Sequence, residues 1–174
     1  MRVPTILAIY LLLLVLTQNP AQVSSQTPAP AMPSTEGETL TGKHLVLSQV
    51  SAGHPTILVM GFSKDAGDPA TDWARALRKD PALSQVHVYE AAMLAAAPAF
   101  IRGVIKSSIR KGILPVDQES FVILTRDEQS WRTWFGVTND KESYVVLLDP
   151  QGKIQWHGHG AAKDLLPQLR AAAH

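Results

Sequence analysis

The residues best placed for chemistry form a short polar loop, Ser63–Asp68, that follows an apolar run and precedes an amphipathic stretch. A serine hydroxyl becomes a nucleophile only beside a positioned base and an oxyanion hole. No sequence feature places a histidine beside Ser63, so we predict no catalytic residue. A loop at the start of a helix can instead dock a peptide or an anion, which makes Ser63, Lys64 and Asp65 candidate partner-binding residues.

The absence of cysteine narrows the chemistry further. Without a thiol, the chain has no thiolate nucleophile, no disulfide and no thiolate metal ligand. His157 and His159 have an i, i+2 spacing that can bind a metal from one side of a strand, but the other histidines are scattered along the chain. We therefore expect no metal site and no small-molecule cofactor.

A second candidate surface is basic and follows a predicted helix over Ala97–Lys111. Its cations, which we call the basic ridge, are Arg102, Lys106, Arg110 and Lys111. The apolar stripe beside the ridge consists of Phe100, Ile101, Val104, Ile105 and Ile109. Positions 91–116 contain no acidic residue. The ridge could bind anionic lipid head groups or an acidic partner; an ordinary solvated face is the alternative.

The polar loop must be positioned by the elements on either side of it. Thr56–Phe62 is nearly continuously apolar, as a strand covered on both faces should be. Asp68 is placed to cap the next helix, and Pro69 suits its first turn. That helix has an apolar face made of Ala70, Trp73, Ala74 and Leu77. It should end before Asp80-Pro81.

Further elements alternate along the rest of the chain. A strand or hairpin is predicted over 39–50, and strands over 86–92, 121–125, 144–148 and 153–157. A short helix with Asp127 as its cap should end at Gly136, and a last helix with Asp164 as its cap should cover 164–173. The turn Asp149–Gly152 predicts a hairpin with a bulge at Gly152.

This order is β-α-β, an inserted helix and strand, a further helix, a β-hairpin and a terminal helix. It predicts an α/β fold: a thioredoxin-like sandwich with a mixed central sheet, an inserted helix-strand, and a C-terminal β-hairpin plus helix. In that plan the redox pair lies on the loop occupied here by Ser63–Asp68, and a cis-proline precedes the first hairpin strand. Glu142-Ser143 takes the place of the cis-proline, so both halves of a redox site are missing.

Three stretches carry a family resemblance: GFSKDAG at Gly61–Gly67, IRGVIKSSIRKGILP at Ile101–Pro115, and YVVLLDPQGKIQWHGHG at Tyr144–Gly160. Together they resemble the thioredoxin-like assembly factors of the mitochondrial ATP synthase Fo sector, a family with bacterial relatives. The resemblance implies a non-enzymatic chaperone that helps a membrane-embedded Fo subunit to fold or assemble.

The amino terminus has the features of an export signal. Arg2 precedes an apolar run, Ile6–Leu16, which is shorter than the ~18–20 residues that span a bilayer. Val23 and Ser25 suit a cleavage site, and an uncleaved anchor is the alternative. Either form places the domain outside, in the periplasm or facing the extracellular side, whereas the mitochondrial proteins act in the matrix.

The chain therefore divides into a signal peptide or anchor (1–25), a flexible linker (26–39) and a thioredoxin-like domain (40–174). The formal net charge of +1 lacks the positive excess of nucleic-acid-binding proteins, so no nucleic-acid partner is expected. The predicted function is a redox-inactive assembly protein whose partner is a membrane-protein client or an anionic membrane surface. The alternatives are a thioredoxin-fold enzyme using non-thiol chemistry, and a membrane-surface binding module.

Overall fold

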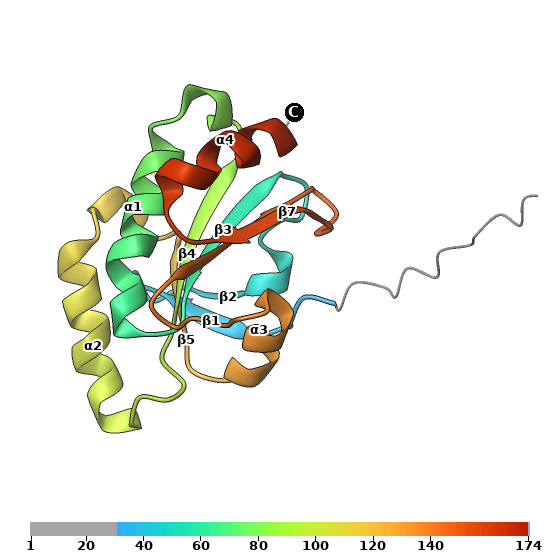
Figure 1. The fold of residues 1–174 in the computed structure, drawn as a ribbon. Coiled ribbons are helices and arrows are strands. Elements are labelled where there is room, and N and C mark those ends of the chain that lie inside the picture. The colour runs from blue at the N-terminus through green and yellow to red at the C-terminus, as the bar shows by residue number, and fades with distance from the viewer. Residues whose placement is uncertain (1–30, 174) are drawn as a thin grey trace, which may run out of the picture.

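Residues 31–173, which the computed structural model describes, contain one seven-stranded mixed sheet (Figure 1). The strands are β1 (Glu36–Thr39), β2 (His44–Val46), β3 (Thr56–Gly61), β4 (His87–Met93), β5 (Phe121–Leu124), β6 (Ser143–Leu148) and β7 (Ile154–His159). Their order across the sheet is β2-β1-β5-β4-β3-β6-β7. The central strands β3, β4 and β5 are parallel, and the outer pairings are antiparallel.

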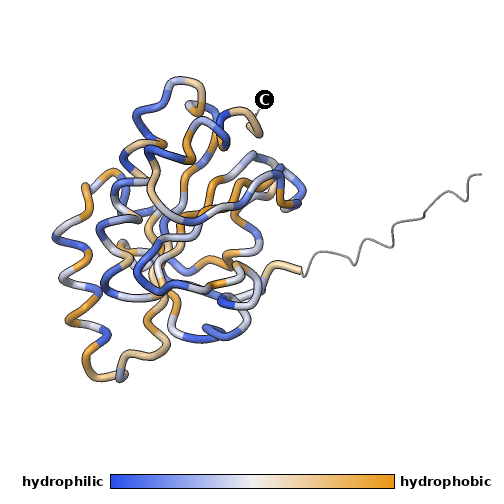
Figure 2. The backbone as a smooth tube through the Cα atoms, viewed as in Figure 1, coloured by the Kyte–Doolittle hydropathy of each residue, from blue (hydrophilic) through white to orange (hydrophobic). Residues whose placement is uncertain are grey.

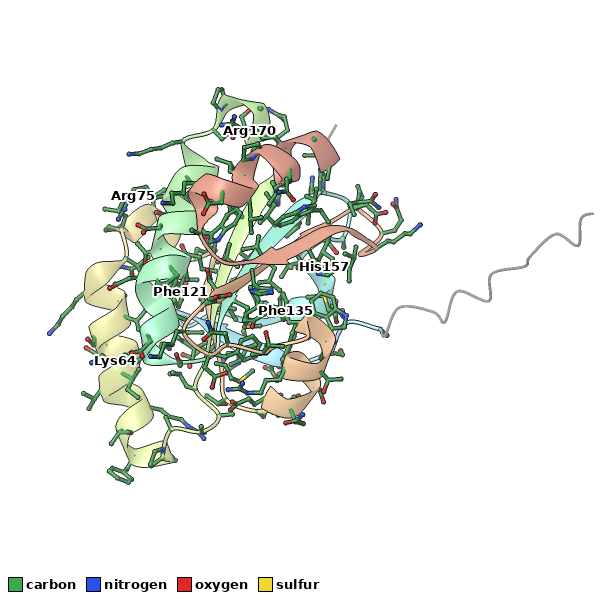
Figure 3. All side chains as sticks on the ribbon, viewed as in Figure 1. Lys64, Arg75, Phe121, Phe135, His157 and Arg170 are labelled. Carbon is green, nitrogen blue, oxygen red and sulfur yellow. The ribbon has the colours of Figure 1, made fainter. Side chains whose placement is uncertain are left out.

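Helices cover both faces of this sheet in the described part of the chain. They are α1 (Gly67–Arg78), α2 (Ala99–Gly112), α3 (Glu128–Phe135) and α4 (Ala162–Ala172). Figure 1 shows α1, α2 and α4 on one side and α3 on the other. Side chains labelled in Figure 3 mark the two layers, with Arg75 on the α1 side and Phe135 on the α3 side. The predicted α/β architecture is confirmed, including the inserted α2–β5 unit and the terminal hairpin with α4.

Alternation along the central strands divides the core between the two faces. Leu58 and Met60 of β3 lie in one cluster with Trp131 of α3. Their neighbours Ile57 and Val59 lie in the other cluster, with α1 and α4. Successive side chains of a strand point to opposite faces, so a strand buried on both faces must be apolar throughout. That requirement explains why the sequence predicted β3 and β6 correctly.

The predicted linker over 26–39 is wrong in its last part, because Glu36–Thr39 forms β1. Its backbone pairs with β2 on one side and with β5 on the other. A Cβ atom on Gly37 would lie 2.4 Å from Val122 Cγ1, so glycine is what allows this close approach. A short polar strand of this kind carries no apolar alternation, which is why the sequence did not reveal it.

The predicted helix caps at Asp68, Asp127 and Asp164 are also wrong. Asp68 and Asp164 lie inside the first turns of α1 and α4, one or more residues after the helix start. Asp127 holds the N-cap position of α3 but adopts a left-handed backbone conformation with φ 61°. Its carboxylate accepts a hydrogen bond from Thr35 Oγ1 at 2.7 Å and caps nothing.

Thr35 joins the start of the described chain to α3. Its hydroxyl donates to Asp127 and accepts a hydrogen bond from the buried indole nitrogen of Trp131 at 3.0 Å.

The prediction of a hairpin after β6 is confirmed, and Gly152 has the left-handed conformation that its turn requires (φ 79°). The predicted signal peptide or anchor, 1–25, lies outside the described residues. Among the described residues, no helix is both long and apolar enough to span a bilayer.

Candidate functional site

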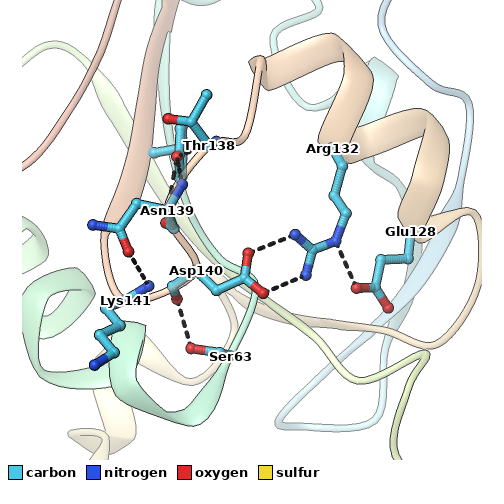
Figure 4. A network of polar contacts seen from close by, with 8 residues as sticks. Ser63, Glu128, Arg132, Thr138, Asn139, Asp140 and Lys141 are labelled. Carbon is cyan, nitrogen blue, oxygen red and sulfur yellow. Dashed lines mark hydrogen bonds and ion pairs between the residues drawn. The ribbon is translucent and has the colours of Figure 1, made fainter.

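The loop after β3 meets the loop before β6 because these two strands are antiparallel neighbours. Gly61, the last residue of β3, lies opposite Ser143, the first residue of β6. Beyond Gly61 the chain makes a 3-10 turn, Lys64–Ala66, and then enters α1. The Ser63 hydroxyl donates to the backbone carbonyl of Asp140 at 2.6 Å (Figure 4). The two loops are therefore joined directly.

Arg132 of α3 holds the second loop from the other side (Figure 4). Its guanidinium donates to both carboxylate oxygens of Asp140, at 2.6 and 3.0 Å, and to Glu128 at 2.8 Å. These hydrogen bonds raise the pKa of Arg132 and lower the pKa of Asp140. The same guanidinium lies 5.3 Å from the ring centre of Phe62. The loop over 138–142 is thus fixed to α3 as well as to Ser63.

Glu142 occupies the position that the fold offers to a cis-proline, and its carboxylate is engaged. His159 Nδ1 lies 2.5 Å from Glu142 Oε2, and the Asn139 amide donates to Glu142 Oε1 at 2.9 Å. The hydrogen bond from His159 is the main reason that the pKa of Glu142 is lowered. His159 also stacks on the ring of Tyr144, with ring centres 5.0 Å apart. Asn139, Glu142, His159 and Tyr144 therefore form a cluster of contacts at the start of β6.

Ser63 and His159 are the side chains of this arrangement that could act as a nucleophile and a base, and each of them has another partner. The Ser63 hydroxyl donates its hydrogen bond to the Asp140 carbonyl, and the His159 ring is paired with Glu142. Ser63, Lys64 and Asp65 are all exposed. Within residues 31–173, no group of three metal-ligating side chains comes together. The polar groups of the site are therefore engaged with one another or exposed to solvent.

A groove of about 620 Å³ adjoins this site, between α1 and α4. Its lining includes Asp72, Ala76, Glu142, Gly160, Ala161 and Leu166. The Trp73 indole donates to the Gly160 carbonyl at 2.7 Å, which holds the loop after β7 against α1. The groove combines backbone groups at 160–161 with apolar and charged side chains. A segment of another polypeptide can be recognised by such a surface.

The structure separates the predicted site residues into two groups. Ser63, Lys64 and Asp65 lie together on the loop before α1, whereas the basic ridge lies on α2. Two ridge cations are used inside the domain. Arg102 donates to the carbonyls of Ala95 and Ala97, and the Lys106 ammonium pairs with Glu38.

The other two ridge cations lie near the end of α2. Arg110 contacts Gln118, and Lys111 has no side-chain partner among the described residues. The ridge is thus less available than its spacing predicted.

Sequence reasoning missed Arg132 and Asp140, although both hold the site together. Arg132 lies between Trp131 and Trp134, whose helical spacing indicates packing and gives no sign of a polar contact to the loop before β6. The pairing of Glu142 with His159 could have been found from the hairpin. The strand register places Tyr144 opposite His159. Glu142 lies two residues before Tyr144 and is therefore close to the end of β7.

Comparison with solved structures identifies the fold. MTB DsbF has 20% sequence identity and a TM-score of 0.52, and the match covers 84% of this chain and 99% of that one. The exposed lipoprotein thioredoxin Etrx1 of Streptococcus pneumoniae has 17% identity and a TM-score of 0.54, covering 80% and 98%. BsSco, a member of the Sco family of cytochrome c oxidase assembly proteins, has 14% identity and a TM-score of 0.54, covering 82% and 92%. At these identities the likeness shows the fold, which is thioredoxin-like.

Sequence comparison identifies the family. No curated protein matches the chain at a significant level. The model of the family described as ATP10 protein matches residues 18–165, which is most of the chain and includes both the loop and the α2 region. The resemblance inferred from the three sequence stretches is thereby confirmed, and the chain belongs to the ATP10 protein family of ATP synthase assembly factors.

Proposed function

We propose that this protein is a non-enzymatic, redox-inactive assembly factor that binds a membrane-protein client. The family supports an assembly role, and the resemblance of the sequence points to a client like those of the ATP synthase Fo sector. The complete absence of cysteine supports redox inactivity, because disulfide exchange and peroxide reduction on this fold require a thiolate.

The observation that carries the proposal is the state of the loop before α1. In a redox-active protein of this fold, that loop would present a thiol pair. Here Ser63 donates to the Asp140 carbonyl, and Arg132 holds Asp140 from the opposite side. A loop fixed in this way is a preorganised contact surface, which lowers the ordering cost of binding a partner. Exposed Lys64 and Asp65, together with the adjoining groove, are the proposed client contacts.

We also propose that the domain works outside the cytoplasm, in the periplasm or facing the extracellular side. The support is Arg2 followed by the apolar run Ile6–Leu16. The same segment could anchor the domain in the inner membrane if it is not removed. A client embedded in that membrane would then be within reach.

Photo-crosslinking in native membranes tests the client contact. The full chain carries a photoreactive residue at Lys64 in one variant and at exposed Gln151 of the β6–β7 turn in the control. We expect a membrane-protein subunit to be crosslinked from position 64 and not from position 151. Equal labelling from both positions, or none from position 64, would contradict the proposed contact.

Turnover assays test the absence of catalysis. We expect no insulin disulfide reduction and no peroxide consumption by the purified protein. A reproducible hydrolytic or redox turnover that Ser63→Ala abolishes would overturn the proposal and establish the enzyme alternative. Ser63→Ala removes one exposed hydrogen bond, so the variant should keep its fold.

A further inference from the structure

We infer that the outward face of α2, together with the segment that follows it, binds the surface of an anionic membrane. We call this region the α2 apolar surface and define it by Phe100, Val104, Leu114 and Val116. The inference is independent of the proposed client, because it concerns the lipid itself.

The α2 apolar surface is unusually exposed. The exposed fractions are 85% for Phe100, 72% for Val104, 66% for Leu114 and 82% for Val116. These are the large hydrophobic residues that the described domain leaves in solvent. All four lie within 17 positions of the sequence, so exposed apolar side chains are concentrated in this one region. Such a concentration marks an interaction site.

The stripe predicted from sequence is in fact divided between two sides of the helix. Ile101, Ile105 and Ile109 are half-buried, and Ile109 packs on the cluster containing Phe121 and Ile123. At 100° per residue, the mean direction of Phe100 and Val104 lies about 120° from that of this inward set, and Lys111 shares the line of Phe100 and Val104. No residue of α2 is fully buried. The helix therefore uses one apolar row for packing and leaves a second row free.

Nothing in the described domain covers the second row. Phe100 and Val104 are 85% and 72% exposed, and a Cβ atom added to Gly103, between them in the sequence, would meet no atom within 4 Å. In Figure 1, α2 lies at the outer edge of the domain, and Figure 2 shows several hydrophobic segments along it and just after it. An approaching surface can reach this helix along its whole length.

Charge identifies the occupant as anionic. Lys111 lies on the outward row, and exposed Arg110 precedes it. The nearest acidic residues in the sequence are Glu90, which is buried, and Asp117, which pairs with Arg78. Glu38 of β1 reaches α2 but is paired with Lys106, away from Arg110 and Lys111. Apolar side chains flanked by uncompensated cations are the signature of a helix that lies in the head-group region of a bilayer. A second copy of the chain fits less well, because two-fold pairing of this face would bury the Lys111 ammonium of each copy in an apolar interface.

The absence of native cysteine makes a direct depth measurement possible. Three full-chain variants, Val104→Cys, Val116→Cys and Lys153→Cys, each carry one environment-sensitive dye. Lys153 lies in the exposed turn between β6 and β7 and serves as the control. The probes are vesicles of phosphatidylglycerol mixed with phosphatidylcholine, and vesicles of phosphatidylcholine alone, both containing a lipid-borne quencher. Measuring depth at each position separates α2 from any membrane binding by residues 6–16.

We expect the dyes at 104 and 116 to be quenched on the anionic vesicles and not on the neutral ones, while the dye at 153 stays in water. Reversing two charges, Arg110→Glu with Lys111→Glu, should lower the binding constant of position 104 at least about tenfold. The matched reversal of Lys141 and Lys153 should lower it less. Phe100→Ser should weaken quenching at position 116 by roughly tenfold.

Three results would overturn the inference. The first is that dyes at 104 and 116 remain in water on anionic vesicles. The second is that they become shielded without vesicles and in proportion to protein concentration, which would indicate a second copy. The third is that both charge-reversed variants lose binding equally, which would indicate a response to net charge alone. Circular dichroism of each variant confirms that the exposed substitutions leave the fold intact.

Discussion

Arg78→Met is the substitution whose effect on stability the structure predicts most directly. Arg78 Nη1 lies 2.8 Å from Glu90 Oε1, and its Nε lies 3.2 Å from Asp117 Oδ1. The Glu90 side chain is only 2% exposed, and within residues 31–173 no group other than Arg78 reaches its carboxylate. Removing the guanidinium would leave a buried, uncompensated negative charge.

The expected loss is large because the Glu90 carboxylate is nearly closed to water. Breaking a fully buried ion pair costs about 3–5 kcal/mol of unfolding free energy. The Arg78 side chain is 26% exposed, so water can partly replace it, and we expect about 3 kcal/mol, at the lower end of that range. Arg75→Met is the matched control on the same helix. Its partner Asp72 is exposed, so the control should lose less than about 0.5 kcal/mol.

The loss should also depend on pH in a defined direction. Burial raises the pKa of Glu90 above 4.5, and Arg78 opposes that rise. Without Arg78 the pKa in the folded state rises further, so the native state binds more protons than the unfolded state between the two pKa values. Stability of the variant must then fall as pH rises through that interval. Urea denaturation at pH 4 and pH 8 measures this.

We expect Arg78→Met to lose more at pH 8 than at pH 4, and Glu90→Gln in the same background to recover part of the loss. A loss below about 1 kcal/mol, or an equal loss at both pH values, would refute the assignment of Glu90 as a buried charge that depends on Arg78.

Two further predictions concern β1 and the candidate site. Gly37→Ala should destabilise the domain by about 1–3 kcal/mol, because its Cβ would clash with Val122; Gly103→Ala, in the open face of α2, should instead stabilise it by about 0.5–1 kcal/mol. Thermal denaturation compares the two, and similar effects would contradict the close packing of β1 against β5. His159→Gln should move the pKa of Glu142 upward toward its ordinary value, because the hydrogen bond from His159 is the main cause of its lowering. Carbon-13 NMR of the carboxyl group measures it, and an unchanged titration would argue against the pair.

The sequence predicted those parts of the fold in which burial imposes a pattern. β3 and β6 are buried along their whole length, so their apolar runs were unambiguous. α1 places four buried residues on one face, and the same periodicity revealed it. β1 has no such pattern, since its place between β2 and β5 depends on backbone pairing and on a glycine. The prediction of the Asp127 helix cap was wrong for a related reason, since it too depends on contacts that local sequence does not reveal. Asp127 looked like a cap, but a partner distant in sequence, Thr35, engages its carboxylate.

The sequence could predict which loops form the candidate site, but only some of the side chains that hold it together. Topology alone puts the loop after β3, which carries Ser63, beside the loop before β6, which carries Glu142. Arg132 was not predicted, because its role depends on how α3 is oriented over the sheet. Neither could the sequence divide the stripe on α2 into an inward and an outward row. Both rows satisfy the same helical spacing, and only the positions of β1 and β5 decide which one is covered.

The double hydrogen bond of Thr35 has a mechanical consequence. Met32 packs on the core just before this residue, and Thr35 is hydrogen-bonded to both Asp127 and Trp131, so the start of the described chain is fixed to α3. The next residue of α3, Arg132, holds Asp140, whose carbonyl in turn holds Ser63. A load applied at the start of the described chain therefore has a short hydrogen-bonded route to the loop before α1.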